Sequence, residues 1–498
     1  MKVILDLANN HQGDIEHGMK VITDHALAIA DFNAEKILKF QFRELSSFIH
    51  PAATKENCSY LERFTSTSLT WDEFSQLATH AKDCGFKTAC TPFDEASVDK
   101  ITEIGFDYIK IASCSACDWP LLEKAIDANL PMIVSTGGLQ LNEIDNVVSF
   151  LTHRAASFSL MHCISLYPTN SSDCHLSNIS LLKGRYPGTE IGWSTHEDPE
   201  NTSLVGIAVS LGATLLERHI GIRTDKYSLN AYSSTPAQIS TWLHSLEDHL
   251  NSIRHPDYTD LVQRQKQALM SLSRGTYAAR DISKGEEISH SDVFFAFPIL
   301  DDAFPSGDWK ESSTALKYIK KGGALTRDNC RLPADSKGMA IKTSIHEIKA
   351  LLSVAGIHLN SEFEVEYSHH YGMESFREVG CAIINCINRS YCKKLLVMLP
   401  GQRHPLHHHP LKEETFQLLY GDLRLTLDGQ ERNLQPGCTC LVLPGVWHEF
   451  SSQGGAVIEE VSSTHYDNDS IYKDVRIRSS KRSDRKTIVD HWGRYQFQ

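Results

Sequence analysis

Histidine and glutamate side chains are spaced like metal ligands in residues 401–421, GQRHPLHHHPLKEETFQLLYG. One residue separates His407 from His409, so both imidazoles would lie on one face of a β-strand and His408 on the other. Glu414 follows five residues after His409. Imidazole and carboxylate together suit Mn, Fe, Ni or Zn and leave coordination positions open for a substrate.

A fourth ligand comes from a second segment, GCTCLVLPGVWH, in which His448 stands eleven residues after Gly437. Short strands separated by turns would bring this histidine to the same interior as the first segment. Glu413 is the alternative carboxylate, and a metal-free core with retained histidines is the alternative to a metal site. The predicted ligands of this divalent metal are His407, His409, Glu414 and His448.

A second set of reactive side chains stands near the ends of eight short apolar segments in residues 1–255. The segments are residues 3–8, 36–41, 86–92, 108–113, 131–137, 158–165, 189–196 and 214–221. Apolar strands that alternate with amphipathic helices predict a parallel sheet, and eight units in about 250 residues predict a TIM barrel. An open doubly wound sheet is the alternative, but the first turn, ANNHQGD, lacks its GxGxxG.

Catalytic groups of a TIM barrel lie at the carboxyl ends of its strands. Those ends and the turns after them carry Asp6, Asn10, His11, Lys39, Gln41, Thr91, Lys110, Ser113, Ser135, Thr136, Ser165, Tyr167, Ser194, His196, Glu217 and His219. Two lysines among hydroxyls predict a pocket for a phosphate or carboxylate. Two histidines from adjacent strands suit a divalent cation with open positions.

The composition is that of a folded protein of several domains, with 41% hydrophobic and 22% charged residues among 498. A net charge of -13 argues against a nucleic-acid partner. The sequence contains neither a long apolar run nor an export signal, so we expect no membrane span and a cytoplasmic location. The 13 cysteines are then expected to be reduced, with a redox role for the CSAC pair as the alternative.

Eight motifs resemble those of the sialic acid synthase family over residues 1–335: HQGD, LKFQ, CTPFDEASVD, YIKIAS, STGG, MHCISLYPT, IGWSTH and LLERHI. The resemblance implies condensation of phosphoenolpyruvate with an aldose to give a 3-deoxy-2-keto sugar acid and phosphate. It implies that Lys39, Thr91, Lys110, Ser113, Ser135 and Ser194 hold phosphoenolpyruvate, and that His196 and His219 bind Mn²⁺ or Mg²⁺. We expect Asp6, Lys39, Lys110, His196 and His219 to be catalytic, and Asn10, Gln41, Ser165 and Tyr167 to bind substrate.

Composition divides the rest of the chain. We expect a barrel in residues 1–255, a linker in 256–272, a small β-rich domain in 273–335, an all-β domain in 336–475 with almost no helix, and a basic tail in 476–498. The small domain resembles the antifreeze-like (SAF) domain, which implies a domain-swapped homodimer; a spacer is the alternative. The tail is expected to be solvated, with a phosphate-binding role as the alternative.

The all-β domain resembles the cupin family, with Leu443 where the second motif usually has proline. Its HPLKEETF segment resembles cupin sugar isomerases, so the domain is expected to isomerise or bind a sugar. Two other functions remain open: a cupin sugar isomerase or epimerase with the barrel as scaffold, and a non-catalytic carbohydrate sensor.

Residues on the acceptor side depart from the family. They are Asp6 in place of Glu, Ser115 in place of an acid, Ser165 in place of Asn, Leu229 or Asn230 in place of Asp, and Phe297 in place of Arg. Lost charged hydrogen bonds cost about 1.5–3 kcal/mol each. We therefore expect an aldose other than N-acetylmannosamine, shorter or without the 2-acetamido group.

Overall fold

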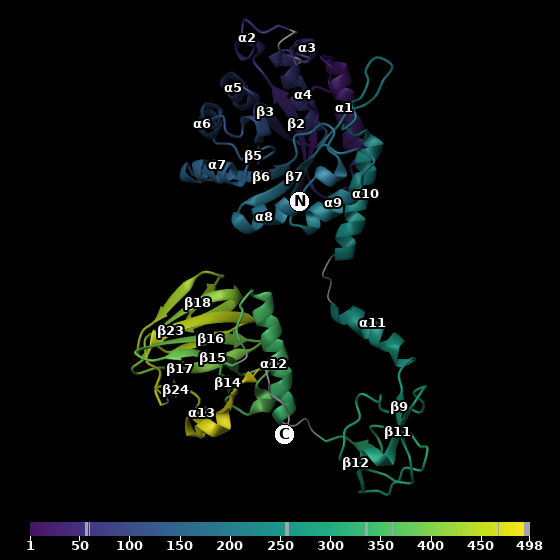
Figure 1. Cartoon of the computed structure of the whole chain (residues 1–498), viewed down its shortest axis with the longest axis vertical. Coiled ribbons are helices and arrows are strands. Elements are labelled where there is room, and N and C mark those ends of the chain that lie inside the picture. The colour runs from purple at the N-terminus through teal and green to yellow at the C-terminus, as the bar shows by residue number, and fades with distance from the viewer. Residues whose placement is uncertain are drawn as a thin grey trace. The chain divides into compact units, whose positions relative to one another are not determined.

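A computed structural model of the chain describes residues 1–54, 58, 60–253, 258–333, 337–360, 362–466 and 468–492 (Figure 1). The chain divides into two compact units, residues 1–258 and 259–498, and each is described by itself. The expected boundary between barrel and linker, at residues 255–256, and that between small domain and cupin, at 335–336, lie outside the described residues.

The first unit is a closed barrel of eight parallel strands, which confirms the predicted TIM barrel. Its strands are β1 (Lys2–Asp6), β2 (Glu35–Phe42), β3 (Lys87–Pro92), β4 (Tyr108–Ile111), β5 (Met132–Ser135), β6 (Phe158–Cys163), β7 (Glu190–Thr195) and β8 (Leu215–His219). Pairing of β1 with both β2 and β8 closes the barrel and aligns Asp6 with Lys39 on one side and His219 on the other.

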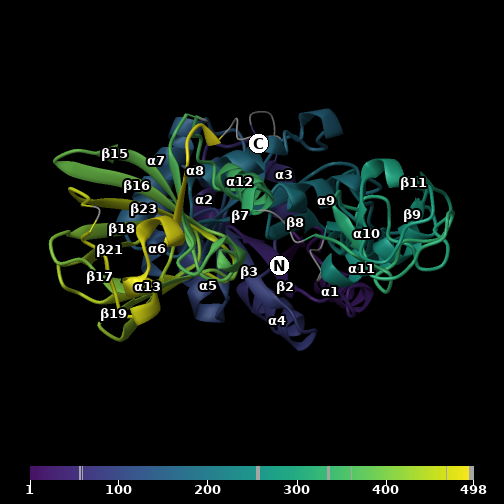
Figure 2. The same ribbon diagram turned by 90° about the horizontal axis from the view of Figure 1, so that it is seen from below.

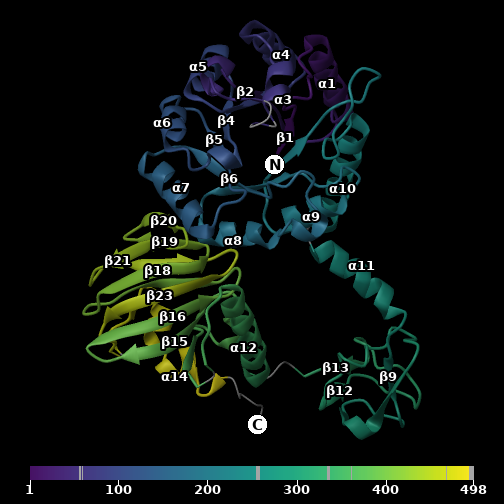
Figure 3. The ribbon, with the colours of Figure 1, turned by 45° about the horizontal axis from the view of Figure 1, so that its top comes forward.

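Helices surround the strands (Figure 3). They are α1 (Ile15–Ala28), α2 (Leu45–Phe48), α3 (Leu61–Ser66), α4 (Trp71–Asp83), α5 (Glu95–Ile104), α6 (Trp119–Asp127), α7 (Leu141–His153), α8 (Ser177–Arg185), α9 (Ser203–Ser210) and α10 (Pro236–Ile253), with 3₁₀ turns η1 (Ser113–Ser115) and η2 (Ser171–Asp173). Local sequence sets their starts: Thr70 and Glu73 form a capping box at α4, and Asp94 caps α5.

Two layers of side chains fill the barrel interior. The lower layer is apolar and consists of Ile4, Ile37, Ala89, Ile133, Met161 and Leu215, with Tyr108 packed against them. Side chains two residues further along a strand point to the same side. Because the apolar layer faces inward, the residue two positions beyond each of its members must also face inward, at the carboxyl end.

The second unit begins with α11 (Tyr258–Met270) and a small β module. The module contains β9 (Gly275–Ala278), β10 (Glu287–Ile288), η3 (His290–Asp292), β11 (Val293–Ala296), β12 (Ser313–Ala315) and β13 (Cys330–Arg331). Strands β9 and β11 form one antiparallel pair, and β10, β12 and β13 form a second small sheet. Ile282, Ile288, Ile319 and Leu325 are buried in a core of their own. Likeness to an antifreeze-like domain stays a prediction.

Two antiparallel sheets form the remainder, as expected for a cupin (Figure 2). One has the order β21-β18-β23-β16-β15-β14-β25 and the other β20-β19-β22-β17-β24. The strands are β14 (Val365–Ser368), β15 (Cys381–Asn388), β16 (Tyr391–Met398), β17 (Arg403–His408), β18 (Glu414–Gly421), β19 (Leu423–Leu427), β20 (Gln430–Leu434), β21 (Thr439–Val442), β22 (His448–Ser451), β23 (Ala456–Ser463), β24 (Ile471–Tyr472) and β25 (Lys486–Val489), with η4 at Met373–Ser375.

Two expectations for this region were wrong. Helix α12 (Lys337–Val354) precedes the strands, because Ile341, Ile345, Ile348 and Leu352 recur at helical spacing and pack into the core of the larger sheet. The basic segment, as far as residue 492, is folded and does not form a solvated tail. It forms α13 (Val475–Ser479), α14 (Arg482–Arg485) and β25, which pairs with β14, and Trp492 is buried. Residues 493–498 of the expected tail lie outside the described residues.

Among the described residues, none of the helices combines the length and the apolar character needed to cross a bilayer. The 13 cysteines are free thiols, including the exposed Cys114 and Cys117 of the CSAC segment.

Candidate functional site

Charged and hydroxyl side chains form the upper layer of the barrel interior. Each follows a member of the apolar layer by two residues: Asp6, Lys39, Thr91, Lys110, Ser135, Cys163 and Glu217, with Ser194 on β7. All eight line a cavity of about 750 Å³. The alternation of strand side chains therefore places the predicted phosphate-binding residues on one surface.

Two buried lysines share a carboxylate at the centre of this layer. Lys39 Nζ lies 2.8 Å from Asp6 Oδ2 and 3.0 Å from Glu217 Oε1. Lys110 Nζ lies 3.2 Å from Glu217 Oε2 and donates to Ser135 Oγ at 2.5 Å. Ser194 Oγ also donates to Glu217 Oε1, at 3.0 Å. Glu217 was noted at the end of its strand without a role, and only its distances show that it links both lysines.

Burial and charge act differently on these groups. Burial opposes the charge of Lys39, but Asp6 and Glu217 outweigh it and raise the Lys39 pKa. Burial lowers the pKa of Lys110, and Glu217 offsets this only in part. Burial would raise the pKa of Glu217, yet Lys110 and Lys39 hold it well below its usual range. Of the two lysines, Lys110 thus receives the smaller charge compensation from the protein.

The two barrel histidines stand beside this cluster. Their ring centroids are 5.2 Å apart. His196 Nδ1 lies 3.0 Å from the Ile164 carbonyl oxygen, which leaves its Nε2 for a ligand. His219 Nε2 lies 3.3 Å from Asp6 Oδ2, and burial lowers the His219 pKa, with Asp6 opposing. One imidazole from β8 and one from the residue after β7 fit an open cation site with two protein nitrogens.

Other predicted site residues are distributed as follows. Gln41, Ser113, Ser165 and Tyr167 line the cavity, and Tyr167 is 54% exposed. Asn10 is not among the lining residues, because its side-chain amide donates to Ile220 O at 2.6 Å and to Ser233 Oγ at 2.9 Å.

The sequence does not single out several polar side chains that also line the cavity, among them Asn9, Arg43, Arg63 and Tyr232. Strand alternation already contained a signal for Arg43, which follows Lys39 and Gln41 at intervals of two along the same face.

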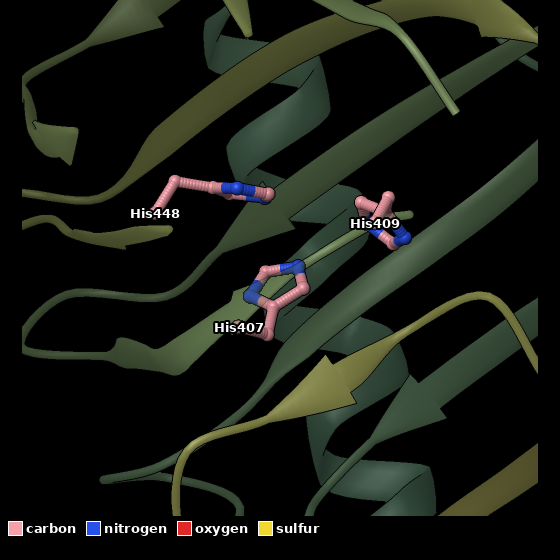
Figure 4. A group of neighbouring side chains, drawn as sticks. All are labelled: His407, His409 and His448. Carbon is pink, nitrogen blue, oxygen red and sulfur yellow. The ribbon is translucent and has the colours of Figure 1, made fainter. Parts of the chain in front are cut away.

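Three histidines converge inside the cupin sandwich (Figure 4). Candidate ligand atoms of His407, His409 and His448 all lie within 4.8 Å of one another. His407 pairs with His448 across β17 and β22. Within the part of the chain that the structure describes, this is the one such group of three or more His, Cys, Asp or Glu residues.

Backbone carbonyls orient the three imidazoles. The Nδ1 atoms of His407, His409 and His448 lie 3.0, 3.1 and 3.1 Å from the carbonyl oxygens of Pro405, Asp469 and Val446. Each Nε2 is then the atom available to a metal, which is the usual arrangement of metal-binding histidines. Burial lowers the pKa of His409 to about 4 and that of His407 well below its usual range, so both rings are neutral.

Glu414 lies among these rings. Its oxygens are 3.4 Å from His409 Nε2 and 3.3 Å from His448 Nε2. The buried Lys412 forms ion pairs with Glu414 and with Glu460, the latter at 3.0 Å. The donor set fits a divalent metal held by three histidines with Glu414 adjacent, and Lys412 was not foreseen. His408 faces elsewhere, with its ring 4.4 Å from that of Trp447.

Fold and site together define a TIM-barrel protein with a cationic, hydroxyl-lined mouth and a histidine-rich cupin. Residues 27–258 match the NeuB family and residues 394–460 match the cupin domain. A crystal structure of a protein assigned as spore coat polysaccharide biosynthesis protein E from Chromobacterium violaceum is 36% identical, with a TM-score of 0.62, and the match covers 66% of this chain and 99% of that one. The chain belongs to the NeuB family and carries a C-terminal cupin domain.

Curated relatives carry names of sugar-acid synthases. The N-acetylneuraminate-9-phosphate synthase of Drosophila melanogaster is 27% identical over 323 residues, which cover 58% of this chain and 85% of that protein. The N,N'-diacetyllegionaminic acid synthase of Campylobacter jejuni is 26% identical over 303 residues, which cover 58% of this chain and 88% of that protein. The chain is thus similar to proteins named as synthases of sialic and legionaminic acids.

Proposed function

We propose that the barrel condenses phosphoenolpyruvate with an aldose to form a 3-deoxy-2-keto sugar acid and phosphate. The main support for this proposal is the buried Lys39–Glu217–Lys110 cluster at the mouth of the barrel. In it, the charge of Lys110 is only partly compensated by Glu217, and Lys110 lies beside the hydroxyl of Ser135. Such a cluster gains most from a dianionic ligand, because a phosphate supplies the missing negative charge.

The reaction forms one carbon–carbon bond and, at C2 of phosphoenolpyruvate, replaces the carbon–oxygen bond to phosphate with one to the oxygen of water. C3 of phosphoenolpyruvate attacks the aldehyde carbon, and positive charge develops at C2. Water adds to C2, and phosphate leaves from the resulting tetrahedral carbon. Of the two protons of this water, one goes to the aldehyde oxygen and the other leaves with phosphate as C2 becomes a carbonyl. The carboxylate of Asp6, close to both Lys39 and His219, is suited to carry the first of them.

The chain's residues have distinct roles in this scheme. Lys110 and Ser135, joined by a hydrogen bond, hold phosphoenolpyruvate through its charged groups. Glu217 fixes both lysines. A divalent cation, Mn²⁺ or Mg²⁺, held by His196 and His219 would supply Lewis-acid polarisation of the aldehyde oxygen.

Purified full-length protein tests this proposal. Incubation with phosphoenolpyruvate, Mn²⁺ and a panel of aldoses should consume phosphoenolpyruvate and yield a 3-deoxy-2-keto acid detectable by mass spectrometry. Lys110→Met should abolish the product in folded protein. Binding of aldoses without any turnover would refute the proposal and favour a carbohydrate sensor.

A second candidate function belongs to the cupin. Three histidines that could hold a metal beside a buried Lys412–Glu414 pair support a metal site next to an acid–base pair, which would be suited to moving a proton between C1 and C2 of a sugar. We propose that this metal, Mn, Fe, Ni or Zn, binds a sugar for aldose–ketose isomerisation. Deuterium exchange at C2 of an aldose, followed by NMR, would detect it, and binding without exchange would leave a sensor.

A further inference from the structure

Arg43 is placed by its strand at the edge of the barrel cavity. It follows the last residue of β2, so its side chain continues the face of Lys39 and Gln41. The guanidinium carbon lies 4.1 Å from the ring centroid of Phe64 and 3.7 Å from that of Phe93. Two aromatic faces therefore fix the plane of the cation and leave its edge for hydrogen bonds.

The hydrogen-bonding capacity of Arg43 is mostly unused. One terminal nitrogen donates to Gln41 Oε1 at 3.3 Å, and the buried Nε has no partner. A guanidinium has five donors. Among the residues that the structure describes, no carboxylate forms an ion pair with Arg43. Burial, together with repulsion from Arg63, lowers the pKa of Arg43 to about 10. A partly buried cation without an anion is costly unless a ligand supplies one.

A second arginine faces the same space. Arg63, on α3, lines the cavity, and it too has no ion-pair partner among the described side chains. The aromatic rings of Phe48, Tyr60 and Phe64 line the same cavity. Two guanidinium groups that line one cavity without an ion-pair partner among the described residues favour a ligand with a compact negative charge.

Polar contacts connect Arg43 with the centre of the barrel. Arg43 donates to Gln41, Gln41 Nε2 donates to Asp6 Oδ2 at 3.5 Å, and Asp6 lies 3.3 Å from His219. An aldose whose carbonyl reaches His219 can thus extend its hydroxyls along this line toward Arg43. Beside Arg43 lies a second cavity of about 220 Å³, which shares Asn9, Gln41, Arg43 and Phe64 with the first.

We infer that the acceptor aldose carries an anionic group at the end remote from its carbonyl, and that Arg43 binds this group with help from Arg63. The inference rests on the proposed condensation and goes beyond it by naming the class of acceptor. The shared chemistry is a terminal anion, either a phosphate monoester or a carboxylate. The side cavity next to Arg43 gives such a group room.

Matched acceptors test the inference in the full-length protein with Mn²⁺. Arabinose is compared with arabinose 5-phosphate, mannose with mannose 6-phosphate, and mannose with mannuronate, by loss of phosphoenolpyruvate. We expect kcat/KM to be ~10–100-fold higher for an anionic member of a pair than for its neutral partner, as charged hydrogen bonds would give. The phosphate and carboxylate arms decide which anion is preferred.

Variants separate a binding role from a structural one. Arg43→Met should remove most of the preference for the anionic acceptor, and Arg43→Lys should keep part of it, since Lys keeps the charge without the planar fork. Arg154→Met is the matched control. Arg154 also stacks on an aromatic ring, with its guanidinium carbon 3.6 Å from the Phe150 centroid, but it lies outside the cavity. It should leave the preference unchanged.

Binding gives a readout that does not depend on turnover. Calorimetry with arabinose 5-phosphate should show a loss of affinity in Arg43→Met but not in Lys110→Met, which alters the phosphoenolpyruvate side. If no aldose is condensed yet this pattern of binding is seen, the condensation is refuted and the anion site stands. Equal affinity and turnover for neutral and anionic sugars in the wild-type protein would overturn the inference.

Discussion

The same substitution should destabilise the barrel to very different degrees at its two buried lysines. Lys39 has two carboxylate partners, at 2.8 and 3.0 Å, and its pKa is raised because Asp6 and Glu217 outweigh burial. Lys110 has one carboxylate, at 3.2 Å, and burial lowers its pKa. Lys39 thus stabilises the folded barrel strongly, whereas Lys110 contributes little to its stability.

The magnitudes follow from what each substitution leaves behind. Lys39→Met strands Asp6 and part of the Glu217 charge, and a buried charge that loses its partner costs about 3–5 kcal/mol. Lys110→Met leaves Glu217 with Lys39 and Ser194, each at 3.0 Å, so we expect a loss of about 1 kcal/mol or less. Both variants should lower phosphoenolpyruvate turnover by at least ~100-fold.

Hydrogen exchange in urea, followed in peptides that cover β1 and β2, measures how much each substitution lowers the stability of the barrel itself. The pH dependence gives a second check. Lys110 and Lys39 hold the Glu217 pKa below its usual range despite burial, so the stability that Glu217 contributes is present above the unfolded pKa of about 4.3 and is lost as the pH falls through the folded value. The difference in the free energy of unfolding between wild type and Lys39→Met should therefore become smaller at acid pH. Equal destabilisation by the two substitutions would refute the reasoning.

Four further predictions concern the cupin, the acceptor and the assembly. The double variant His407→Ala, His409→Ala should lose the cupin metal in elemental analysis but still condense a supplied aldose. His408→Ala is the control and should keep the metal, because the His408 ring lies against Trp447. Loss of condensation in the folded double variant would show that the two sites are coupled. Burial raises the pKa of Glu366, but Lys486 outweighs it and brings the pKa to about 2. Glu366→Gln should therefore lower the free energy of unfolding by about 1–2 kcal/mol at pH 7 and by less below pH 4. Hydrogen exchange of residues 471–492 would measure this loss. N-acetylmannosamine should give a lower kcat/KM than unacetylated aldoses, and a clear preference for it would contradict the expected change of acceptor. Analytical ultracentrifugation should find a homodimer that persists when residues 336–498 are deleted but not when residues 273–335 are deleted as well.

The sequence by itself determined the barrel and most of its mouth. Side chains alternate along a strand and parallel strands share one carboxyl end, so a polar residue two positions after an apolar one, such as Lys110 after Tyr108, could be assigned to the site without coordinates. The HxH pair and its distant histidine were readable for the same reason, because strand periodicity fixes the face of each imidazole. Helix α12 was also predictable, because its apolar residues Ile341, Ile345, Ile348 and Leu352 recur at helical spacing. The many strand-like segments that follow it favoured an all-β domain instead.

Tertiary structure alone decided which charges meet. Nothing local in the sequence shows that Glu217 on β8 lies between lysines from β2 and β4, since that depends on closure of the barrel. The basic segment near the end of the chain looked like a solvated tail because the partner of β25 is β14, more than a hundred residues earlier. Arg43 shows the same limit: its position along the strand was foreseeable, but the two aromatic rings that hold it come from α3 and the end of β3. Long-range packing, which local sequence does not encode, determines whether a charge is paired or free for a ligand.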